Sequence, residues 1–148
     1  MAVIPLTQGK VALVNERDWG WLSRHKWYYH KEGQSEYAQR RSGCHTVRMH
    51  RVILEAPPGI EVDHRNHNGL DNRRRNLRLA TKSQQRANSR STSRFKGVSW
   101  NRWAGEWQAR IQVKGKQIHL GYFKRKQDAA HAYRATARQY FGEFAFAR

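Results

Sequence analysis

Hydrophobic and polar residues alternate most regularly in the second half of the chain. In WQARIQV, residues 107–113, the apolar residues share one face: Trp107, Ala109, Ile111 and Val113. QIHLGYF, residues 117–123, resumes the alternation after a KGK turn, and we expect Ile118, Leu120 and Tyr122 to point inward. Such alternation is typical of half-buried strands. With FKGVSW as a further strand, the pattern predicts a three-stranded antiparallel sheet.

The apolar spacing changes to that of a helix after residue 123. One stripe follows an i, i+3, i+4, i+7, i+8, i+11 series: Ala129, Ala132, Tyr133, Thr136, Ala137 and Tyr140. Gly142 can end this helix, since glycine adopts the backbone conformation of a C-terminal cap. The small alanines permit the helix to pack closely on the sheet.

The first half of the chain predicts short strands and turns. KVALVN alternates, and YAQRR followed by HTVRM indicates a hairpin that turns at Ser42 and Gly43. The aromatic residues between positions 19 and 29 are expected to fill a small core. MHRVILEAPPG predicts a short helix over residues 50–55, which Pro57 and Pro58 cannot continue.

A polar stretch, KSQQRANSRSTSR over residues 82–94, separates the two halves. It is either an exposed helix that runs into a tether or tether throughout. We therefore expect two domains, residues 1–90 and 91–148. Within the first, N-terminal strands over 1–48 precede a core over 49–90.

The charge of the chain indicates its partner. The 148 residues include 29 Lys and Arg against 11 Asp and Glu, a formal net charge of +18, which attracts polyanions. Double-stranded DNA is the expected partner. We expect no membrane association, because no run approaches about 18 apolar residues. The start lacks the pattern of a secretory signal, and the single Cys44 can form no internal disulfide, so we expect a cytoplasmic, nucleoid-associated protein.

Candidate chemistry is concentrated in VDHRNHNGLDNRRRNLRLAT, residues 62–81. Hydrolysis of a phosphodiester needs a base that prepares water and a hard cation that neutralises charge. A neutral imidazole, with an ordinary pKa of about 6.5, suits the base, and an amide oxygen can fix its tautomer without adding charge. Neighbours on a strand point to opposite faces, so Asp63 and His64 can serve one phosphate only if the strand bends there.

The motifs VDH, DNR and NLR, with MHRVIL upstream, resemble those of the HNH endonucleases of the homing type, which have the ββα-metal fold. The resemblance covers residues 45–90 closely and implies a hairpin of 61–64 against 77–80, a long loop and a following helix. It implies these roles: His64 as catalytic base, Asp63 as metal ligand, Asn76 as the residue that orients the base, and Asn72 as a residue that pins the loop. The helix of this family carries a second metal ligand, an asparagine, where this chain has Gln85, with Asn88 one turn further on. Either residue could complete the site.

The resemblance implies one divalent cation, Mg²⁺ or Mn²⁺, and no small-molecule cofactor. A structural zinc site is the alternative for four residues: Cys44, His50, His64 and His67. These lack the paired short spacings of zinc modules, so we expect no structural zinc. A lone Asp-His dipeptide is common on surfaces, and only the whole pattern in so basic a chain indicates a nuclease.

The second half resembles the apetala-two/ethylene-response-factor (ERF) DNA-binding domain in FKGVSW, GEWQARI, KQIHLGYF and DAAHAYRATARQYFGE. In that family a three-stranded sheet lies in the major groove and a helix packs behind it. The resemblance places DNA contacts at eight residues: Lys96, Ser99, Asn101, Trp103, Arg110, Gln112, Gln117 and His119. The alternation also puts Arg110 and Gln112 on the polar face, where such groups can pair with guanine and adenine edges.

The sequence therefore predicts an α+β protein with a ββα-metal nuclease module followed by a three-stranded antiparallel sheet packed on one helix. We expect a monomeric, metal-dependent endonuclease that hydrolyses double-stranded DNA held by the C-terminal sheet, with Arg73 and Arg74 on the DNA backbone. The main alternative is a sequence-specific DNA-binding or regulatory protein with an inactive nuclease site, which Gln85 favours. Nonspecific RNA packaging is a third hypothesis.

Overall fold

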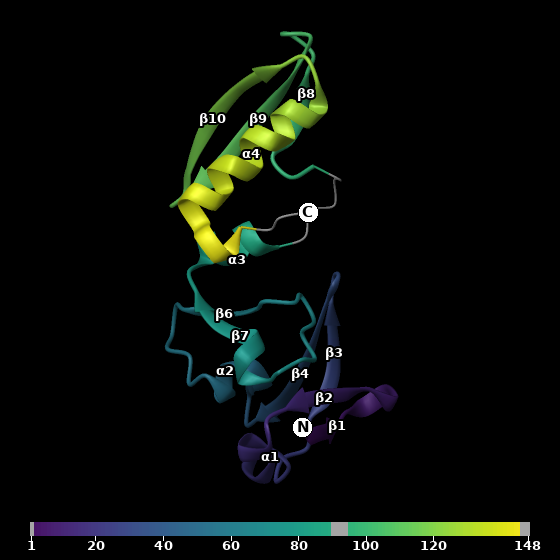
Figure 1. The fold of residues 1–148 in the computed structure, drawn as a ribbon. Coiled ribbons are helices and arrows are strands. Elements are labelled where there is room, and N and C mark those ends of the chain that lie inside the picture. The colour runs from purple at the N-terminus through teal and green to yellow at the C-terminus, as the bar shows by residue number, and fades with distance from the viewer. Residues whose placement is uncertain (1, 90–94, 146–148) are drawn as a thin grey trace. The chain divides into compact units, whose positions relative to one another are not determined.

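A computed structural model describes residues 2–89 and 95–145 of the chain (Figure 1). It is mixed α+β, with small antiparallel sheets and four α-helices in the described residues, which confirms the predicted class. The chain forms two compact units, Met1–Thr81 and Lys82–Arg148. The domain boundary expected between residues 90 and 91 lies outside the described residues. No helix in the described ranges is long and apolar enough to cross a membrane.

The first unit contains three small antiparallel sheets, β1–β2, β3–β4–β5 and β6–β7. Its elements run in this order: β1 (Ala2–Pro5), η1 (Thr7–Gly9), β2 (Val11–Val14), α1 (Glu16–Leu22), β3 (Tyr28–Glu32), β4 (Ser35–Ser42), β5 (His45–Arg48), α2 (Met49–Ile53), β6 (Glu61–His64), η2 (Arg74–Asn76) and β7 (Leu77–Ala80). The predicted β4–β5 hairpin and the short helix before Pro57 are both present.

One apolar core joins these sheets. Its innermost side chains come from distant parts of the unit: Val14, Leu22, Met49 and Ile53. Trp27 is the one residue of the N-terminal aromatic cluster that is buried, and its Nε1 donates to Leu22 O at 2.9 Å. Trp19 is 46% exposed instead, with its Nε1 donating to Val3 O. The cluster therefore fills the core only in part.

The β6–β7 hairpin has the bounds that the resemblance implies, and its register puts Asp63 opposite Arg78 and His64 opposite Leu77. The loop between these strands is attached to β2, because Leu13 N donates to Leu70 O and Asn72 N donates to Leu13 O, each at 2.8 Å. Gly69 lies so close to β4 that an added Cβ would overlap the carbonyl oxygen of Glu36. The long loop is thus fixed by backbone contacts to two other sheets.

The second unit consists of a sheet in the order β10–β9–β8 with a long helix across one face (Figure 1). Its elements are α3 (Lys82–Asn88), β8 (Val98–Asn101), β9 (Glu106–Val113), β10 (Lys116–Phe123), α4 (Lys126–Phe141) and η3 (Gly142–Phe144). Ala109 and Ile111 of β9 are buried, as are Ala129 and Ala137 of α4. Alanine on both sides of this interface permits the close packing that the sequence predicts.

Two details of the predicted packing are wrong. The β9–β10 register shifts between His119 and Gly121, and this irregularity turns Tyr122 outward, opposite Gln108 and 47% exposed. On α4 the buried face follows i+4 steps from Ala129 through to Phe141, so Tyr140 is 51% exposed. The first error arises because the alternation was extended through a bulge. In the second, α4 is regular, and its buried face ends at Phe141, the i+4 position after Ala137, instead of Tyr140, the i+3 position.

Candidate functional site

Asp63 and His64 lie at the end of β6, and each is only 7% exposed. The Asp63 carboxylate faces Arg78, whose Nε and Nη2 are both 2.8 Å from Oδ2. The His64 imidazole instead faces Asn72, with 3.4 Å between Nε2 and Oδ1. The strand ends here in a turn, since His67 N donates to His64 O at 3.0 Å. The two neighbours therefore have different partners at the place where the strand stops.

His64 is held in its neutral form. Burial lowers its pKa, while the contact with Asn72 and the charges of Asp63 and Asp71 oppose that shift. Because the net shift is downward from 6.5, the imidazole is neutral near pH 7. A neutral ring is the form that a general base requires.

The ring of His50 packs edge-on against His64, with centroids 5.0 Å apart and planes at 86°. His50 comes from α2 and is only 4% exposed, and burial lowers its pKa to about 2. Tyr37 also packs against His50, with ring centroids 5.6 Å apart and planes at 53°. We assigned His50 no part in this site from the sequence, although MHRVIL was the signal that could have placed it there.

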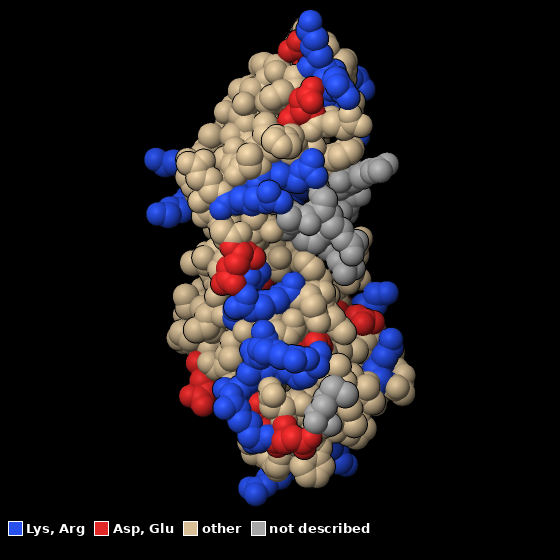
Figure 2. Space-filling model, in the orientation of Figure 1, with Lys and Arg blue, Asp and Glu red and all other residues tan. Residues whose placement is uncertain are grey.

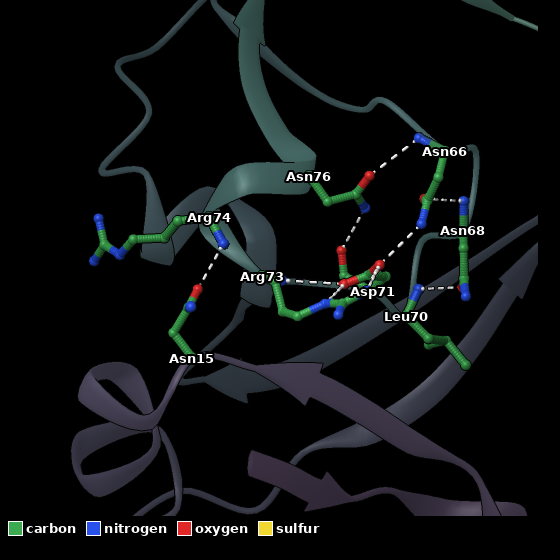
Figure 3. A network of polar contacts seen from close by, with 8 residues as sticks. All are labelled: Asn15, Asn66, Asn68, Leu70, Asp71, Arg73, Arg74 and Asn76. Atoms are coloured by element: carbon green, nitrogen blue, oxygen red, sulfur yellow. Dashed lines mark hydrogen bonds and ion pairs between the residues drawn. The ribbon is translucent and has the colours of Figure 1, made fainter. Parts of the chain in front are cut away.

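The asparagines of the loop form a connected network (Figure 3). Asn76 Oδ1 accepts from Asn66 N at 3.0 Å, and its Nδ2 donates to Asp71 O at 2.7 Å. Asn66 Oδ1 accepts from Asn68 N, and Asn68 Oδ1 accepts from Leu70 N. These amides satisfy backbone groups that the irregular loop leaves unpaired. They explain why so many neutral amides surround the Asp-His pair.

The asparagine that contacts His64 is not the one expected. The resemblance implies that Asn76 orients the base and that Asn72 pins the loop. Asn72 does hold the loop, because its Nδ2 donates to Gly69 O, but its Oδ1 also lies against His64. The Asn76 side chain instead binds backbone groups of the loop. The difference depends on β2, which holds the Asn72 backbone in place from a position remote in sequence.

Arg73 and Arg74, expected to contact the DNA backbone, are paired with carboxylates. Arg73 Nη2 lies 2.6 Å from Asp71 Oδ2, and Arg74 Nη2 lies 2.8 Å from Asp18 Oδ1 (Figure 3 shows the first pair). Each guanidinium lowers the pKa of its carboxyl partner. Asn15 Oδ1 also accepts from Arg74 N at 2.8 Å. These two arginines therefore fasten the loop to α1 and to itself.

The donor set at the hairpin suits a hard cation that keeps most of its water. Asp63 supplies a carboxylate, and Mg²⁺ is commonly bound through one or two carboxylates together with substrate phosphates. No cluster of three His, Cys, Asp or Glu side chains that could hold a metal occurs in the described ranges. Gln85 lies on α3, which belongs to the second unit. Arg78 competes with any cation for Asp63.

The polar face of the C-terminal sheet carries a hydrogen-bonded network. Arg110 Nη2 donates to Gln108 Oε1 at 2.7 Å, and Gln108 Nε2 donates to Ser99 Oγ at 3.0 Å. Asn101 Nδ2 reaches the hydroxyl oxygen of Tyr122 at 3.4 Å. The network joins three strands and holds Arg110 in one orientation.

The remaining residues that we expect to contact DNA differ in exposure and in the groups that they contact. Gln112 and Gln117 are opposite each other in the register, and His119 is opposite Arg110 and packs on Tyr122 with ring centroids 4.7 Å apart. Trp103, in the turn after β8, is fully exposed. The Lys96 ammonium is directed to carbonyl oxygens at the end of α3. Tyr122 was missed on this face, although a glycine inside a strand pattern is a signal for a bulge.

Known proteins resemble this chain over both halves. The family model for HNH endonucleases matches residues 47–87. An uncharacterized HNH endonuclease of Acanthamoeba polyphaga mimivirus is 33% identical over 144 residues, which span 93% of this chain and 74% of the relative. Protein 3.8 of Escherichia phage T7 is 32% identical over 107 residues, or 66% of this chain and 88% of that protein.

A third relative is an ethylene-responsive transcription factor of Arabidopsis thaliana, 33% identical over 66 residues. That match spans 38% of this chain and 15% of the plant protein. The family model spans the β6–β7 hairpin, and the mimivirus relative, named as an HNH endonuclease, matches 93% of this chain. The chain belongs to the HNH endonuclease family.

Proposed function

We propose that the protein is a metal-dependent endonuclease of the homing type, in which the β6–β7 hairpin hydrolyses phosphodiester bonds of duplex DNA bound by the C-terminal sheet. The observation that carries the proposal is the neutral, buried imidazole of His64 with the amide oxygen of Asn72 at its Nε2. A further proposal is that it acts as a cytoplasmic monomer.

The tautomer of His64 follows from its partner. The amide oxygen of Asn72 can only accept, so Nε2 carries the hydrogen and Nδ1 takes the proton from water. Asn72 thereby acts as the residue that orients the base. His50 limits rotation of the ring, because the two imidazoles pack together at 5.0 Å with their planes at 86°.

A Mg²⁺ or Mn²⁺ ion held by Asp63, with Gln85 or Asn88 as the residue that completes the site, would neutralise charge on the phosphate and the leaving oxygen. Before such an ion binds, Arg78 neutralises the Asp63 carboxylate. Arg73 and Arg74 keep the loop in place by their pairs with Asp71 and Asp18.

The sheet face supplies groups for DNA. Arg110 and Gln112 of β9 can pair with base edges in a major groove wide enough for a β-ribbon. The neighbouring strands carry the other candidates, Ser99 and Asn101 on β8 and Gln117 and His119 on β10. Lys114, Lys116 and Lys124 can reach phosphates, and Trp103 can contact sugar or base. On the visible side of each unit, which for the second unit is the side of α4, Figure 2 shows more Lys and Arg than Asp and Glu, in keeping with a polyanionic ligand.

The test is cleavage of supercoiled plasmid in Mg²⁺, in Mn²⁺ and in chelator. We expect nicked or linear product with either ion and none in chelator. The alternative, a DNA-binding or regulatory protein with an inactive nuclease site, is favoured by Gln85 and by the Asp63–Arg78 pair. Specific duplex binding without cleavage in any divalent ion would decide for that alternative.

A further inference from the structure

Lys96 lies in the second unit, just before β8, and its ammonium is directed at α3 of the same unit. Nζ donates to Ala87 O and to Ser89 O, each at 2.9 Å, and also contacts Arg86 O and Ser89 Oγ. These oxygens belong to the last turn of α3 and the residue that follows it. One side chain thus binds two carbonyl oxygens of the last helical turn and the residue that follows it.

A cation at the C-terminal end of α3 should stabilise this helix. The last four carbonyl groups of a helix have no partner within it, and they carry the negative end of the helix dipole. α3 has only seven residues, a length that is marginal for an isolated helix. The carbonyl oxygens favour the charged ammonium, while burial lowers the pKa of Lys96 to about 8.

The other end of α3 is held by the same unit. Lys114 N, in the turn between β9 and β10, donates to Ser83 Oγ at 3.3 Å. The helix also packs on η3 and α4. The match to the HNH endonucleases, residues 47–87, therefore includes a hairpin from the first unit and a helix held by the second.

We propose that Lys96 is a positioning residue of the nuclease, which holds α3 and its candidate metal ligands Gln85 and Asn88 on the C-terminal unit, rather than a contact to DNA. The inference rests on the proposed function. The C-terminal unit then has two roles. Its sheet binds DNA, and it also holds the helix of the nuclease motif in place.

The test compares Lys96→Met with Lys124→Met in the full chain, since each removes one positive charge from the same unit. For Lys96→Met we expect duplex affinity within about twofold of wild type, an unchanged salt dependence of binding, and kcat at least about tenfold lower with little change in KM. Lys96→Arg should restore most of kcat, because a guanidinium can donate to the same carbonyls. Lys124→Met should weaken binding and reduce the salt slope by about one.

Hydrogen exchange in the absence of DNA supplies a readout independent of cleavage. Lys96→Met should accelerate exchange of the α3 amides while those of α4 stay protected, which separates loss of the helix end from global unfolding. The inference is overturned if Lys96→Met weakens binding as Lys124→Met does, or if it cleaves at the wild-type rate with α3 exchange unchanged. A wild-type protein that does not cleave overturns the proposed function alone, and the exchange and binding measurements still decide the role of Lys96.

Discussion

Asp63 and Arg78 face each other across the β6–β7 hairpin, with both Nε and Nη2 of the guanidinium 2.8 Å from one carboxylate oxygen. Both side chains are buried, at 7% and 8% exposure. A divalent cation at Asp63 must therefore share the carboxylate with Arg78 or displace it. The affinity of the site for metal depends on this competition.

Removal of Arg78 should make the unfolding free energy of the protein more dependent on bound metal. Arg78→Gln leaves a buried carboxylate without its cationic partner, a change that costs about 3 kcal/mol of unfolding free energy in chelator. Added Mn²⁺ should recover more stability in this variant than in wild type, as measured by urea denaturation. The double variant Asp63→Asn/Arg78→Gln should lose the extra response. An equal Mn²⁺ response in all three proteins would contradict a cation at Asp63.

Loss of the Asn72 amide should slow cleavage more than it weakens the fold. Asn72→Ala removes the acceptor at His64 Nε2 and should lower kcat by at least about tenfold, at a cost of about 1–3 kcal/mol in unfolding free energy. Asn68→Ala is the matched control, because Asn68 is exposed and its side chain serves a local turn. Single-turnover cleavage measures the effect, and equal rates for the two variants would show that Asn72 does not orient the base.

The buried His50 predicts a dependence of stability on pH. Its pKa is about 2 in the folded protein and near 6.5 when unfolded, so between these values the unfolded state binds one more proton. The unfolding free energy should therefore fall, by about 1 kcal/mol per pH unit from this residue, as pH decreases below 6.5. His50→Phe keeps a ring beside His64 and should flatten that slope. Urea denaturation between pH 5 and pH 7 tests this, and an unchanged slope would contradict the burial of a neutral His50.

The hydrogen bonds on the polar face of the sheet predict how much Arg110 and Gln108 each contribute to DNA binding. Arg110→Ala should cost about 1–3 kcal/mol of binding free energy and relax the preference at one base pair. Gln108→Leu should have a smaller effect of the same kind, because Gln108 positions Arg110 through the 2.7 Å hydrogen bond. Selection from a randomised duplex library measures both preferences. A uniform loss over all sequences would instead place Arg110 on phosphate.

The sequence was sufficient where partners are close along the chain or follow an unbroken repeat. The β6–β7 hairpin, with Asp63 opposite Arg78, has its predicted bounds since short motifs specify both strands. Contacts between residues that are distant along the chain could not be predicted from these patterns. Arg74 pairs with Asp18, and Asn72 takes its position from Leu13. The orientation of Tyr122 depends on a local irregularity that an alternating pattern does not reveal.

The role of His64 as the catalytic base is decided by cleavage by His64→Ala, compared with wild type at equal occupancy of the same duplex. We predict that the variant binds DNA within about twofold of wild type and, at saturating protein and Mg²⁺, cuts at least about a hundredfold more slowly, in keeping with the usual contribution of a general base. Cleavage by the variant at the wild-type rate would contradict the assignment of His64 as the base of this nuclease.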